Sequence, residues 1–207
     1  MKYYVFSCTG RTASKRLCGL LNNTVHDKST TSLSCPYSIT NDNLLVKTSD
    51  VNLEHPSVEL FENLPDGAVI HSHGTILPED TDNWTFILTT RKSIAEQIMS
   101  SFISAKLNNW NPIDPSIGLD SFELEEKNVL GMKNFIEEGN KNFMEKTKNF
   151  ITIYLEDSIE EIEQKLRISF TLEGLDNDKK WLSNHHYKDI IKNYEKVFEW
   201  CGENIPC

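Results

Sequence analysis

Short runs of apolar and β-branched residues alternate along this chain with longer stretches in which apolar residues recur every three or four positions. The short runs predict strands at 3–7, 44–48, 68–72, 84–90 and 150–155. The longer stretches predict helices at 13–22, 56–63, 92–108, 121–147, 157–168 and 186–201. Strands that alternate with helices predict an α/β fold with a central parallel sheet and right-handed crossovers.

The segments between these elements predict loops. Residues 24–43 are rich in Ser, Thr and Asn, and residues 109–120 contain two prolines and a glycine. The long helix at 121–147 is expected to be interrupted near Gly139. Without an internal repeat or a composition boundary, residues 1–207 are expected to form a single domain.

Composition narrows the class of protein. The 207 residues are 38% hydrophobic and 25% charged, and the net charge is −10. This acidic balance disfavours nucleic acid and anionic membranes as partners. No apolar run is long enough to span a membrane, and the first strand starts at residue 3, so no cleaved leader is expected. The five widely spaced cysteines form no C-x-x-C pair, which favours reduced thiols in a cytoplasm and no metal site; Cys8 is a minor candidate for a redox-sensitive thiol.

A loop rich in hydroxyl groups and cations follows the first strand. Residues 8–17 read Cys-Thr-Gly-Arg-Thr-Ala-Ser-Lys-Arg-Leu and lead into a helix. Unpaired amides at a helix start attract anions, and Arg11, Lys15 and Arg16 add positive charge in an acidic chain. The loop therefore predicts a site for a phosphorylated ligand. It is not a Walker A loop, since Ala13 replaces the second glycine and Arg16 follows the lysine.

Two further segments carry candidate chemistry at strand ends. His71 and His73 alternate on the strand at 68–72, so they share a face, and an imidazole near a carboxyl end can accept a proton from a hydroxyl. Arg91 ends the next strand, where a guanidinium suits a phosphate, and Ser100 and Ser101 follow on a helix. The alternatives are structural or surface histidines and serines that only pack.

Taken together, the three segments resemble the sulfotransferases that use 3′-phosphoadenosine 5′-phosphosulfate (PAPS), and particularly short bacterial and viral members. Residues 10–16 resemble the 5′-phosphosulfate loop, and His71-Ser72-His73 resembles the K-T-H strand end. Arg91 with Gln97 and Ser100 resembles the 3′-phosphate site. The resemblance spans about residues 3–165. It fades in the tail, which lacks the family's R-K-G.

The resemblance implies a P-loop-like three-layer fold and transfer of a sulfuryl group from PAPS to an acceptor hydroxyl or amine. The product would be adenosine 3′,5′-bisphosphate, no metal would be required, and the location would be a cytoplasm, that of the host if the source is viral. His73 would be the base, with Glu79 or Asp80 in reserve, and Arg11 would stabilise charge on the leaving group. The other implied donor-binding residues are Gly10, Thr12, Ala13, Ser14, Lys15, Arg16, Arg91 and Ser100, with Ser101 in reserve.

Two other functions stay open from the sequence. One is a small-molecule kinase that uses ATP and magnesium, and the other is a non-catalytic nucleotide-binding relative. The acceptor cannot be read from the sequence, because acceptor pockets in such folds are built from variable loops.

Overall fold

The fold is known from a computed structural model, which describes residues 1–9, 12–26, 37–39, 44–47, 54–56, 61, 64–73, 77–107, 120–170 and 187–206. The strands are β1 (Lys2–Phe6), β2 (Tyr37–Ile39), β3 (Leu44–Lys47), β4 (Glu54–Pro56), β5 (Val69–Ser72), β6 (Trp84–Thr90) and β7 (Ile151–Tyr154). The helices are α1 (Ser14–His26), α3 (Ile94–Lys106), α4 (Glu126–Thr147), α5 (Ile159–Leu166), α6 (Tyr187–Ile190) and α7 (Tyr194–Cys201).

In the described part of the chain, seven strands form one sheet in the order β4-β3-β2-β5-β1-β6-β7. Strands β5, β1, β6 and β7 are all parallel, and β2 continues this pattern beside β5. Strands β3 and β4 extend that edge in antiparallel pairing. The parallel core of the predicted α/β sheet is therefore confirmed.

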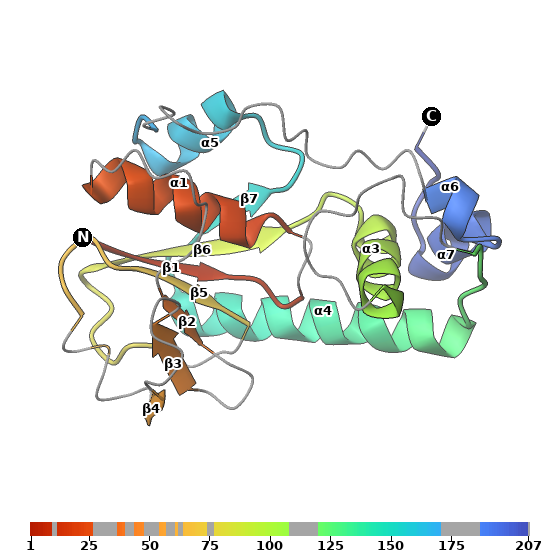
Figure 1. The fold of residues 1–207 in the computed structure, drawn as a ribbon, viewed down its shortest axis with the longest axis horizontal. Helices are drawn as coiled ribbons and strands as arrows, with labels where there is room; N and C mark the ends of the chain where they lie inside the picture. Colours follow the sequence, from red (N-terminus) through yellow and green to blue (C-terminus); the bar gives the residue numbers. More distant parts are fainter. Residues whose placement is uncertain are drawn as a thin grey trace.

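Alternate residues of β1 point to opposite faces of the sheet, and each face is covered by helices. Tyr3 and Val5 pack in one cluster with residues of α1 and α5, while Tyr4 and Phe6 pack on the other face. There, Phe143 of α4 stacks on Phe6 with ring centroids 4.5 Å apart. Figure 1 shows the resulting layers, with α1 and α5 on one side of the sheet and α4 on the other.

A third hydrophobic cluster joins α3, α4 and α7 beyond the carboxyl ends of the strands (Figure 1). Helix α1 follows β1 in the chain, and α4 is the last helix between β6 and β7. The two helices lie on opposite faces of the sheet, while β1 and β6 are neighbours. At such a change of side, open α/β sheets bind their ligands at the carboxyl ends of the strands.

Several sequence predictions need correction. Strand β2 lies within 24–43, which was predicted as loop. Pro56 belongs to β4, so the helix predicted at 56–63 does not start there; Phe61 is helical, and the rest of that segment lies outside the described residues. Helix α4 starts at Glu126 and continues without a break through Gly139. The helix predicted over 186–201 is divided into α6 and α7. Most of the loop predicted at 109–120 lies outside the described residues. Within those residues, no helix has the length and apolar character needed to cross a bilayer.

Position 139 requires glycine because α4 lies very close to Cys8, two residues after the end of β1. Cys8 is buried there, its thiol donates to the carbonyl oxygen of Phe135 at 3.2 Å, and burial raises the pKa of this thiol to about 11. A Cβ on Gly139 would overlap the Cys8 sulfur. Cys8 is therefore a protonated packing residue, which removes support for the redox-sensitive alternative.

We expect Gly139→Ala to lower the free energy of unfolding by about 1–3 kcal/mol, because overpacking outweighs the gain in helix propensity. Gly131→Ala on the same helix is the matched control, since its Cβ would meet no atom within 4 Å, and it should stabilise by up to about 1 kcal/mol. Urea unfolding measures both variants. Equal stability of the two would refute the tight contact at Cys8.

Candidate functional site

The predicted anion loop connects β1 to α1 at the carboxyl edge of the sheet. Gly10 and Arg11 lie outside the described residues, so their donor-binding and catalytic roles stay predictions. The helix's own hydrogen bonds begin with Leu17 N–H to the Ala13 carbonyl, at 3.0 Å. The amides of Ser14 and Lys15 precede that bond, and the first turn of α1 contains no acidic residue. This helix start is therefore electrically suited to an anion.

Ala13 has a φ of 59°, in the left-handed region that favours glycine. It occupies the place where the resemblance expects a glycine. A left-handed conformation at a residue other than glycine costs about 1–2 kcal/mol in backbone strain.

The two predicted histidines meet this loop. Ser14 Oγ lies 2.8 Å from His71 Nε2, and Ser7 Oγ lies 3.2 Å from His73 Nδ1. The two imidazole rings contact edge to face, with centroids 4.5 Å apart. The prediction that both histidines face one site at the end of the strand is confirmed.

His73 has a defined tautomer. Its Nδ1 lies 2.8 Å from the carbonyl oxygen of Ser7, which can only accept, so Nδ1 must carry the proton. Burial lowers the pKa of His73, and Lys15 also lowers it, against the opposing effect of the Ser7 hydrogen bond. The neutral ring therefore keeps an unprotonated Nε2, the form that a general base requires.

His71 has a different chemical character. Its residue is 3% exposed, and burial lowers its pKa to about 3, with smaller contributions from His73 and Lys15. A group with that pKa is neutral at physiological pH and is a poor proton acceptor. The structure thus distinguishes the two histidines, and only His73 suits the role of base.

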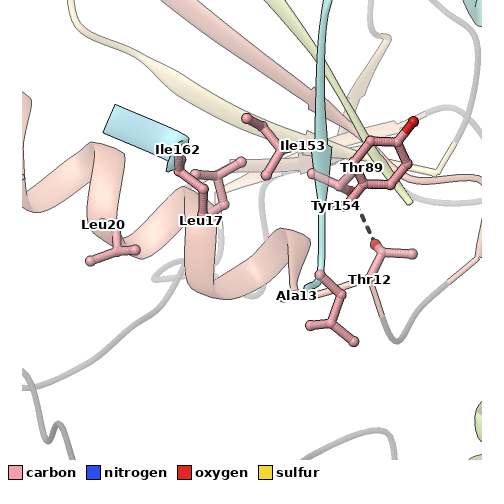
Figure 2. A pocket seen from close by; sticks show the side chains of 9 residues that line it. Thr12, Ala13, Leu17, Leu20, Thr89, Ile153, Tyr154 and Ile162 are labelled. Atoms are coloured by element: carbon pink, nitrogen blue, oxygen red, sulfur yellow. Dashed lines mark hydrogen bonds between the residues drawn. The ribbon is translucent and has the colours of Figure 1, made fainter. Parts of the chain in front are cut away.

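Threonines and a glutamine connect the loop to the end of β6. Thr12 Oγ1 lies 3.0 Å from Thr89 Oγ1, the pair joined by a dashed line in Figure 2. Gln97 of α3 donates to Thr9 Oγ1 at 2.7 Å and accepts from Thr90 at 3.2 Å. The loop therefore contacts both of the other predicted segments at the carboxyl edge of the sheet. Thr9, Thr89 and Thr90 were not singled out from the sequence, although their position at strand ends could have indicated them.

Arg91 departs from its predicted role. Its side chain is 2% exposed, and its guanidinium pairs with Glu96 at 3.0 Å and Glu156 at 3.2 Å. It also donates to the hydroxyl of Tyr187 at 2.8 Å. One cation between two carboxylates leaves a net negative group, so in this conformation Arg91 does not fit a 3′-phosphate.

The predicted partners of Arg91 on α3 are buried as well. Ser100 and Ser101 are each 3% exposed, and Ser101 donates to the carbonyl oxygen of Gln97 within its own helix. The hydroxyl of Ser101 therefore has a partner within its own helix, as the packing alternative expects. The assignment of Ser100 to the 3′-phosphate stays a prediction.

Asp157 and Ser158, which follow β7, have structural roles. Asp157 accepts from the amide of Tyr154 and pairs with Lys165, while Ser158 caps α5 in a capping box. Of the two reserve bases, Glu79 is exposed and Asp80 accepts an amide of its own loop. Neither has a described contact with the histidine cluster.

Beside the first turn of α1 lies a small crevice that is partly open to solvent and has a cavity volume of about 10 Å³ (Figure 2). Its walls are mostly apolar: Thr12, Ala13, Leu17, Leu20, Thr89, Ile153, Tyr154, Leu155 and Ile162. A cavity of this size has room for about one water molecule. In this conformation the crevice therefore does not hold any part of a nucleotide.

The start of α3 already holds an anion, the side chain of Glu203 from the C-terminal segment. Its carboxylate accepts from Ser93 Oγ at 2.6 Å and from the amides of Ile94 and Ala95 at 2.8 and 3.4 Å. This contact over 110 positions was missed by the sequence analysis, because nothing local in the chain pairs Glu203 with Ser93. It fixes the helix that carries Gln97.

We expect Glu203→Ala to lower the free energy of unfolding by about 1–2 kcal/mol, the range for loss of a charged helix cap. Glu199→Gln, at an exposed position on α7, is the control and should change stability by less than about 0.5 kcal/mol. Chemical denaturation compares the two. If Glu203→Ala matches the control, the carboxylate does not hold α3.

No family model, curated protein or solved structure matches the chain. The argument for a function therefore depends on the residues at this edge of the sheet. Within the described ranges, no three His, Cys, Asp or Glu side chains gather as a metal site would require.

Proposed function

We propose that the protein is a sulfotransferase that moves a sulfuryl group from PAPS to an acceptor hydroxyl or amine. The single observation that carries the proposal is the position of His73 beside the start of the anion loop, where the carbonyl oxygen of Ser7, the residue before the loop, holds its Nδ1 proton at 2.8 Å. The parallel core of the sheet, with helices on both faces, supports the proposal, because the resemblance implies a three-layer α/β fold.

The chain's own residues would share the work as follows. Ser14, Lys15 and the amides at the start of α1 bind the 5′-phosphate, and Arg11 adds positive charge there. When bound, PAPS supplies the sulfuryl group and a phosphate leaving group.

His73 Nε2 accepts the proton of the acceptor hydroxyl as its oxygen bonds to sulfur. The bond between sulfur and the bridging oxygen of the 5′-phosphate breaks, and that oxygen keeps the electron pair. Arg11 stabilises the charge that grows on it. The products are a sulfate ester, adenosine 3′,5′-bisphosphate and a proton on His73, which passes to solvent.

A second candidate function is a kinase that uses ATP and magnesium. The observation that favours it is that the guanidinium of Arg91 is already paired with Glu96 and Glu156. Such an enzyme needs no 3′-phosphate site. A sulfotransferase must either release Arg91 from Glu156 or bind the 3′-phosphate elsewhere.

The test is ligand binding by calorimetry and thermal shift. We expect adenosine 3′,5′-bisphosphate to stabilise the protein by about 2.7 kcal/mol at a hundred times its Kd, and AMP at the same concentration to stabilise it less. Stabilisation by ATP with magnesium and none by the bisphosphate would favour the kinase. Transfer of labelled sulfate from PAPS across a panel of alcohols and amines then separates an enzyme from a binding-only relative.

Glu156→Gln tests the role of Arg91 in the same experiment. If the 3′-phosphate takes the place of Glu156, removing this charge should tighten bisphosphate binding about two- to fivefold and leave AMP binding unchanged. Glu138→Gln, an exposed charge change on α4, is the control. Unchanged bisphosphate affinity in Glu156→Gln would leave Arg91 with a structural role alone.

A further inference from the structure

Ser7, Ser14, His71 and His73 form a compact polar cluster under the anion loop. The residues Ser7, Ser14 and His71 are each less than 5% exposed. Ser7 Oγ lies 3.3 Å from Ser14 Oγ and 3.4 Å from His71 Nε2. Because each hydroxyl has one proton, the direction of every hydrogen bond here depends on the tautomers of the two imidazoles.

The bond between Ser14 and His71 is the shortest between side chains of the cluster, at 2.8 Å, and has two possible directions. If His71 Nε2 is bare, the Ser14 hydroxyl donates to it and turns oxygen lone pairs toward the start of α1. If Nε2 carries the proton, His71 donates and Ser14 keeps its own proton for another acceptor. A phosphate accepts hydrogen bonds and donates none when fully ionised. Only the second arrangement lets Ser14 bind one.

We propose that His71 is a positioning residue, held as the Nε2–H tautomer, whose donation to Ser14 directs the serine hydroxyl toward a phosphate at the first turn of α1. This inference rests on the proposed function, since it needs a phosphate-bearing ligand in the loop. The low pKa of His71 is consistent with it, because the ring stays neutral and keeps a single proton to place.

Nitrogen-15 NMR of the protein saturated with adenosine 3′,5′-bisphosphate reports the tautomer directly. We expect His71 with the proton on Nε2 and His73 with the proton on Nδ1, so the second ring is an internal reference. Bisphosphate binding with His71 protonated on Nδ1 would overturn this inference and leave the proposed function standing. Absence of binding would overturn both.

A matched pair of variants tests the effect on affinity. Glutamine places its amide near the position of Nε2, whereas asparagine reaches only the position of Nδ1. We expect His71→Gln to bind the bisphosphate within about threefold of the unmodified protein, and His71→Asn and Ser14→Ala each to bind about tenfold more weakly.

The combined variant Ser14→Ala with His71→Asn should be no weaker than Ser14→Ala alone, because His71 acts through that hydroxyl. Additive losses, or equal losses in His71→Gln and His71→Asn, would refute the positioning role. Thermal melts of each variant identify any that fail to fold. If a variant fails to fold, the tautomer of His71 measured on the unmodified protein tests the positioning role.

Discussion

Replacing His73 by asparagine should cut turnover about a hundredfold or more while leaving the affinity for adenosine 3′,5′-bisphosphate unchanged. Asparagine keeps an amide N–H near the position of Nδ1, so it can still donate to the Ser7 carbonyl that His73 contacts. It has no equivalent of the basic Nε2. The variant therefore removes the base and preserves the local structure.

Steady-state kinetics with saturating PAPS measures this effect, with calorimetry as the control for binding. Because burial lowers the pKa of His73 below the ordinary 6.5, the base stays neutral down to that pH. We expect kcat/KM to fall only below about pH 6.5, where His73 takes up a proton. The pH profile of His73→Asn should lack this fall. Normal turnover in His73→Asn would mean that another group is the base.

Replacing Arg91 by methionine should lower the free energy of unfolding by about 3–5 kcal/mol, the usual cost of removing one partner from a buried ion pair. Glu96, whose side chain is 6% exposed, would lose its partner at 3.0 Å. Burial already raises the pKa of Glu96, and Arg91 opposes that rise. Without Arg91 the pKa rises further, so the variant should be most destabilised at pH 8 and less so at pH 5.

Urea unfolding at the two pH values measures the effect. The added change Glu96→Gln should restore part of the loss, because it removes the charge that Arg91 had compensated. A loss below about 1 kcal/mol, equal at both pH values, would show that the pair contributes little. Because removing Arg91 lowers the stability of the protein, the nucleotide affinity of an Arg91 variant is a poor test of a 3′-phosphate site. Glu156→Gln is a better test, because it keeps Arg91.

The parallel core could be predicted because its strands are buried on both faces. The segment 84–90 is almost continuously apolar or β-branched and became β6 with its limits unchanged. Strand β2 was missed because Tyr37–Ile39 is only three residues long and lies in a polar segment. Gly139 suggested a break in α4, but the helix is continuous, and the missing side chain at this position leaves room for Cys8.

The meeting of the loop with His71 and His73 could also be predicted, because parallel strands end at one edge of a sheet. The environment of Arg91 could not. Its partners Glu156 and Tyr187 lie 65 and 96 positions away, and a guanidinium at a strand end suits a carboxylate as well as a phosphate. Only the three-dimensional arrangement distinguishes the two.

A crystal structure of the complex with adenosine 3′,5′-bisphosphate tests the central claim most directly. We predict the 5′-phosphate within hydrogen-bond distance of Ser14 Oγ and the amides at the start of α1, with His73 Nε2 facing the space beyond it. A nucleotide bound away from α1, with the cluster of Ser7, Ser14, His71 and His73 left untouched, would contradict the account.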